Sequence, residues 1–76
     1  MVEPLMPLLG PPPKGYTWKL TRERGKLLGR SGYTYRLNVY KDGERLEICH
    51  GRISDGDDHE GKVKSMEEKM RKKYSK

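Results

Sequence analysis

The chain has 76 residues, of which 32% are hydrophobic and 37% are charged, and its formal net charge is +6. A chain of this length forms one small domain with a thin core, and it contains no run approaching the roughly 18 apolar residues that span a membrane. Its single cysteine excludes an internal disulfide framework and favours a reducing compartment, so a cytoplasmic protein is predicted.

Residues 1–15 contain all five prolines of the chain. Proline lacks a backbone N–H and restrains the residue before it, so an extended Pro-rich arm is predicted here. The arm lacks the basic n-region of a signal peptide. Two interpretations of its apolar side chains remain open: some of them lie across the core or are simply disordered, or residues 1–13 dock onto another protein. These side chains are Val2, Leu5, Met6, Leu8 and Leu9.

The middle of the chain is predicted to form three strands. Residues 16–24 alternate between large apolar and polar side chains, a period of two that predicts a first strand. Residues 25–32 are glycine-rich and are predicted to form a flexible loop. Residues 33–40 and 44–53 are predicted as the second and third strands, joined by Asp42-Gly43, because a type I′ hairpin turn needs positive φ at both central positions.

A turn at Asp42-Gly43 pairs positions whose numbers sum to 85. The apolar face then holds the pairs Val39 and Leu46, Leu37 and Ile48, Tyr35 and His50, and Tyr33 and Arg52. The polar face holds Tyr40 and Arg45, Asn38 and Glu47, and Arg36 and Cys49. Because a slip of one residue would expose one strand's apolar set, we expect this register to be well specified.

A helix is predicted from about residue 57 or 58 to residue 74. Asp57 and Glu60 resemble a capping box at its start. The stripe Val63, Met66, Met70 and Tyr74 has helical spacing and is predicted to cover the apolar face of the sheet. The expected fold class is therefore α+β: a three-stranded antiparallel sheet with one C-terminal helix packed on one face. This β-β-β-α domain spans residues 16–76 and follows the extended arm.

Chemistry-bearing residues do not assemble into a catalytic or metal-binding pattern. Cys49 and His50 lack a third group spaced to complete a nucleophile, base and orienter. The acidic run of residues 55–60 departs from a calcium loop, because Glu60 stands where that loop requires glycine. We therefore predict a non-enzymatic protein with no catalytic residues, no cofactor and no metal site.

Basic side chains concentrate in residues 14–36 and 62–76, a distribution that favours a polyanionic or acidic partner. Arg, Lys and Asn on the polar sheet face can hydrogen-bond phosphates and base edges, and the glycine-rich loop can follow a nucleic-acid backbone. We therefore predict a nucleic-acid-binding module, with DNA favoured over RNA. The predicted contact residues are Lys19, Lys26, Arg30, Arg36, Asn38, Tyr40 and Arg45.

Three antiparallel strands followed by one helix, with basic side chains such as Lys19, Arg36 and Arg45 and the amide of Asn38 on the outer face, resemble two DNA-binding families. These are the arm-site domains of tyrosine recombinases and the plant AP2-type domain. The resemblance covers residues 16–74 and implies that the outer sheet face enters the major groove. The alternative is a protein-interaction module, a small adaptor or inhibitor of viral or mobile-element origin, which docks through residues 1–13 and its charged surface.

Overall fold

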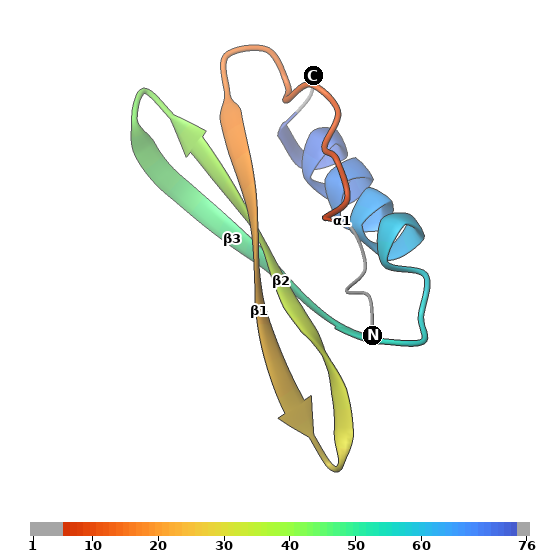
Figure 1. Cartoon of the computed structure of the whole chain (residues 1–76). Coiled ribbons are helices and arrows are strands. Elements are labelled where there is room, and N and C mark those ends of the chain that lie inside the picture. Colours follow the sequence, from red (N-terminus) through yellow and green to blue (C-terminus); the bar gives the residue numbers. More distant parts are fainter. Residues whose placement is uncertain (1–5, 75–76) are drawn as a thin grey trace.

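The computed structural model describes residues 6–74 and shows a three-stranded antiparallel sheet followed by one helix, as predicted (Figure 1). The strands lie side by side in chain order: β1 (Thr17–Leu27), β2 (Arg30–Lys41) and β3 (Glu44–Ser54). Helix α1 (His59–Tyr74) lies across one face of β2 and β3. None of the helical structure in these residues has the length and apolar character needed to cross a membrane.

The core lies between α1 and the middle strand. Alternate residues of β2 point toward the helix, and Tyr35, Leu37 and Val39 are completely buried. Val63 and Met70 of α1 are 1% and 2% exposed and pack in the same two buried clusters. The predicted helical stripe is therefore a core stripe, since burial of these apolar side chains is the main favourable contribution available to so small a domain.

The start of α1 differs from the predicted capping box. The carboxylate of Asp58 accepts a hydrogen bond from the backbone N–H of Gly61 at 3.0 Å, so Asp58 is the N-cap. The carboxylate of Asp57 instead accepts from the backbone N–H of Ser54 at 3.3 Å and closes the turn after β3. One carboxylate therefore caps the helix and its neighbour orders the connection.

Both hairpins close with tight two-residue turns. Asp42 and Gly43 have φ values of 53° and 81°, as a type I′ turn requires, so this predicted turn is confirmed. Leu28 and Gly29 have φ values of 52° and 80° and join β1 to β2 in the same way. The predicted flexible loop at residues 25–32 is therefore wrong, because both strands continue through it. The resulting β1–β2 ribbon projects beyond α1 (Figure 1).

The predicted pairing of β2 with β3 holds only next to the turn. Tyr40 pairs with Arg45, but a bulge then shifts the register by one, so that Val39 pairs with Glu47 instead of Leu46. Leu46 is left 45% exposed, and every β3 side chain beyond it changes face.

A packing requirement explains the shift. The regular register would place His50 and Arg52 beneath α1, where an unpaired charge is costly. The bulge places Gly51 and Ile53 there instead, and Ile53 is 1% exposed. Gly51 suits the position because a Cβ there would lie 2.9 Å from the sulfur of Met66.

The N-terminal arm lies against α1 over the residues that the structure describes (Figure 1). Leu9 packs against both buried clusters, and the Trp18 indole donates to the Gly10 carbonyl oxygen at 3.0 Å. The Arg71 guanidinium donates to the Pro11 carbonyl oxygen at 2.6 Å. These contacts support the interpretation in which the arm covers part of the core. The predictions for Val2 and Leu5 lie outside the described residues.

Glu47 provides a direct test of the shifted register. The Lys73 ammonium, 2.8 Å from its carboxylate, and the Tyr74 hydroxyl both donate to it and lower the pKa of Glu47 below its ordinary value. This carboxylate therefore stabilises the folded state above its unfolded pKa, and that contribution disappears as the pH falls through the lowered folded value. An NMR titration should find the depressed pKa in the wild type, and Lys73→Met should return it toward the ordinary value. A Glu47 carboxyl that titrates normally in the wild type would contradict its placement beneath α1.

Candidate nucleic-acid interface

The face of the sheet opposite α1 is defined by strand alternation and by the bulge. Its β1 and β2 members are Thr17, Lys19, Thr21, Glu23, Thr34, Arg36, Asn38 and Tyr40. Its β3 members are Arg45, Ile48, His50 and Arg52. We call this surface the outer face.

The bulge makes the outer face more basic than the sequence suggested. Glu47 and Cys49, predicted to lie on it, instead lie on the helix side, where Glu47 is bound by Lys73. His50 and Arg52, predicted for the helix side, lie on the outer face and are exposed. Glu23 is therefore the one carboxylate that strand pairing places on this face among residues 17–54. A surface of this kind attracts polyanions.

The predicted contact residues of the outer face differ in whether the structure gives their side chains a partner. Lys19 and Arg45 are exposed, and no hydrogen bond or ion pair holds either side-chain cation within residues 6–74. Arg36 lies 3.4 Å from the Glu23 carboxylate, with 37% and 72% of the two side chains exposed. An exposed pair like this contributes at most about 1 kcal/mol, so Arg36 can exchange Glu23 for a phosphate at low cost. Tyr40 is half-buried opposite Arg45.

Asn38 is placed on the outer face as predicted, but it is only 7% exposed. Its amide nitrogen lies 3.3 Å from the Lys19 carbonyl oxygen and 3.4 Å from the Arg36 carbonyl oxygen, and donates toward them. These donors are engaged with the backbone of the strands. The structure therefore gives Asn38 a role in holding the outer face together.

Lys26 and Arg30 lie next to the Leu28-Gly29 turn at the end of the projecting ribbon, and both are exposed. We call residues 26–30 the hairpin tip. Within the described part of the chain, neither side chain has a hydrogen-bond or ion-pair partner. Both were predicted to follow a nucleic-acid backbone from a flexible loop; the structure places them instead on an ordered ribbon.

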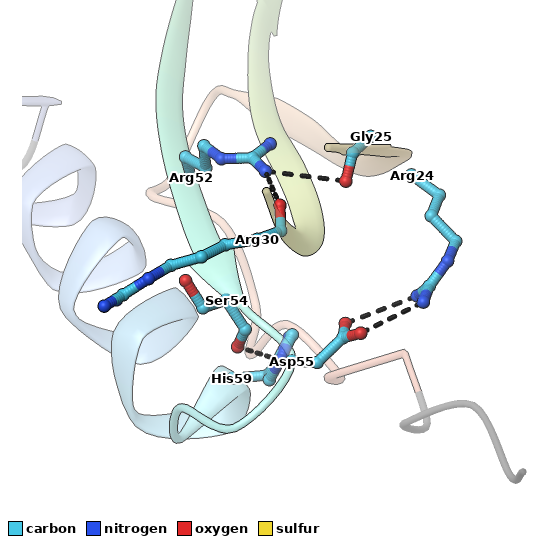
Figure 2. A network of polar contacts seen from close by, with 7 residues as sticks. All are labelled: Arg24, Gly25, Arg30, Arg52, Ser54, Asp55 and His59. Carbon is cyan, nitrogen blue, oxygen red and sulfur yellow. Dashed lines mark hydrogen bonds and ion pairs between the residues drawn. The ribbon is translucent and has the colours of Figure 1, made fainter. Parts of the chain in front are cut away.

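Arg52 is a functional candidate that the sequence did not reveal. Its guanidinium reaches across the ribbon, 3.0 Å from the Arg30 carbonyl oxygen and 3.5 Å from that of Gly25, and donates toward both (Figure 2). Gly25 pairs with Gly32, so no side chain on this part of the outer face obstructs the path of the Arg52 side chain across the ribbon. Because carbonyl oxygens carry no net charge, Arg52 keeps its positive charge available for an anion beside the tip.

The root of the ribbon is fixed to the helix side of the molecule. The guanidinium of Arg24 forms an ion pair with Asp55 at 3.0 Å, and hydrogen bonding to that carboxylate raises the pKa of Arg24 above its ordinary value (Figure 2). Arg22 and Arg24 lie 4.2 and 5.2 Å from the centroid of the Tyr33 ring. These contacts order the base from which the hairpin tip projects.

No family model, curated protein or solved structure matches this chain. In residues 6–74, no group of three or more His, Cys, Asp and Glu side chains is gathered in a way that could hold a metal ion. The assignment of a function therefore depends on the charge and geometry of the outer face and the hairpin tip.

Proposed function

We propose that this protein is a non-enzymatic module that binds nucleic acid, DNA in preference to RNA, and that it acts in the cytoplasm. The observation that carries the proposal is the charge of the outer face, where exposed cations face solvent and Glu23 is the opposing carboxylate. The cations of the outer face and the adjoining tip are Lys19, Lys26, Arg30, Arg36, Arg45 and Arg52.

The geometry of the sheet favours a duplex. A twisted ribbon of two strands is one of the shapes that the major groove of B-form DNA admits, whereas the major groove of A-form RNA is deep and narrow. Lys19 and Arg45 would neutralise phosphates directly. Arg36 would release Glu23 and bind a phosphate with the fork geometry of its guanidinium.

The arm offers less support for a protein-docking function. Leu9 packs against the buried clusters, and Gly10 and Pro11 are bonded to α1. A segment held in this way cannot leave the body to wrap a partner without uncovering the core. Leu8 is 94% exposed and is the arm residue best placed for such contact.

A charge-matched pair of variants tests the proposal. The triple variant Lys19→Gln, Arg36→Gln, Arg45→Gln should bind a short DNA duplex at least tenfold more weakly at low salt. Its slope of log affinity against log salt should fall by about 0.9 for each phosphate that the protein no longer neutralises. The control, Lys62→Gln, Lys64→Gln, Lys72→Gln, removes the same charge from exposed positions of α1. Fluorescence anisotropy of a labelled duplex measures the affinity and its salt dependence for both variants.

The control variant should keep most of the wild-type affinity and salt slope. Equal losses in the two variants would show that net charge alone drives binding, and would contradict a specific role for the outer face. A wild-type protein that binds no duplex at low salt would remove the proposed function altogether.

A further inference from the structure

The hairpin tip combines two exposed leucines, a positive φ at a residue other than glycine, and two flanking cations, and the fold requires none of these three features. Leu28 is 94% exposed and Leu27 is 56% exposed, so neither side chain contributes to the core. Leu28 also has a φ of 52°, in the left-handed region that residues other than Gly, Asn and Asp avoid. Lys26 and Arg30 flank the two leucines with cations.

The second hairpin of the same sheet provides an internal comparison. Asp42 occupies the equivalent turn position with a φ of 53°, nearly the same as that of Leu28. Asp tolerates this conformation and is also favoured in an exposed turn, whereas Leu is favoured on neither ground. Since the fold gains nothing from Leu28, its side chain is best explained by a contact made outside the chain.

The charges around the tip identify the chemistry of that contact. The Arg52 guanidinium lies over the ribbon beside Gly25. The Arg30 side chain extends away from the ribbon (Figure 2). An apolar pair surrounded by cations matches a ligand with apolar faces between rows of anions. Stacked base pairs bordered by phosphates have this arrangement, and architectural DNA-binding proteins insert Leu and similar side chains between base steps.

We propose that Leu28, supported by Leu27, is a wedge that enters between adjacent base pairs of a DNA duplex while Lys26 and Arg30 hold the phosphates on either side. This inference rests on the proposed function and extends it, because it adds local unstacking of the duplex to binding on the outer face. The projection of the ribbon beyond α1 lets the tip reach the bases without a clash from the helix (Figure 1).

The test uses the full chain and a short DNA duplex that carries 2-aminopurine, whose fluorescence rises when a base unstacks. The wild-type protein should bind and raise the fluorescence. Asn is suited to the turn, so the Leu28→Asn variant should fold at least as stably as the wild type. This variant should nevertheless cause no fluorescence rise, and it should bind the duplex about tenfold more weakly than the wild type. Leu46→Asn changes an exposed leucine on β3 and serves as the matched control, which should behave like the wild type.

The outcomes separate the wedge from the proposed function. Duplex binding without any fluorescence rise, or a Leu28→Asn variant that still unstacks the duplex, would overturn the wedge and leave the outer-face proposal intact. No duplex binding by the wild type would overturn both. If Leu28→Asn instead abolished binding to vesicles of phosphatidylcholine and phosphatidylserine while duplex binding was unchanged, the partner of the tip would be a lipid surface, and the wedge would be overturned.

Discussion

Deletion of residues 1–13 is expected to destabilise the fold by about 4 kcal/mol or more, a large part of the total stability of a domain of this size. The deletion removes Leu9 from both buried clusters. It also removes the Gly10 backbone N–H that donates to the carboxylate of Glu67, a residue only 8% exposed, and the Pro11 carbonyl oxygen that accepts from Arg71. Urea denaturation followed by circular dichroism measures the change in the free energy of unfolding.

Two neighbouring leucines of the arm provide the control. Leu9→Ala should cost about 2 kcal/mol because a packed side chain is truncated, whereas Leu8→Ala should change stability by less than about 0.5 kcal/mol because Leu8 is 94% exposed. Equal effects of the two substitutions would contradict the packing of the arm on the core. A stable deletion variant would favour the alternative interpretation, in which residues 1–13 are a free docking segment.

Much of the fold is predictable because it is encoded locally. Alternation of apolar and polar side chains in residues 16–24 predicted β1 and placed Lys19 on the outer face. In the structure the apolar members Trp18 and Leu20 pack against a buried cluster, as this alternation requires. The Asp42-Gly43 dipeptide located one turn from its own backbone preference. These signals involve residues close in sequence, so no knowledge of the packing is needed to interpret them.

The rest depends on interactions between distant residues. The bulge at Leu46 arises because only certain β3 side chains fit beneath α1. The shifted register places Arg52 on the outer face and Glu47 on the helix side. The Leu28-Gly29 turn was missed because Leu is a poor turn residue, and a residue retained against local preference gives no local signal. The burial of Asn38 likewise depends on its neighbours on both adjacent strands, Lys19 of β1 and Ile48 of β3.

The Tyr35 hydroxyl is the centre of a buried polar chain, and its removal is expected to be severe. Tyr35→Ala should cost about 4 kcal/mol because core packing is removed, and Tyr35→Phe about 2 kcal/mol because hydrogen bonds are removed. The Tyr35 oxygen accepts from the Arg22 guanidinium at 3.2 Å and lies 2.8 Å from Nδ1 of His59. His59 Nε2 lies 2.9 Å from the Ser54 carbonyl oxygen, which can only accept. The Nε2 atom therefore carries a proton, and in the neutral imidazole Nδ1 accepts from the Tyr35 hydroxyl.

Tyr35→Phe leaves both Arg22 and His59 without their shared partner, at the point where the β1–β2 ribbon leaves the body. We therefore expect more than a lower free energy of unfolding, because backbone amides of residues 24–33 should exchange hydrogen faster while those flanking Asp42-Gly43 stay protected. Tyr40→Phe is the matched control, since no hydrogen bond holds the Tyr40 hydroxyl within residues 6–74. If exchange at the ribbon were unchanged in Tyr35→Phe, the polar chain would not be what fixes the hairpin tip, and the tip would need another source of rigidity to act as a wedge.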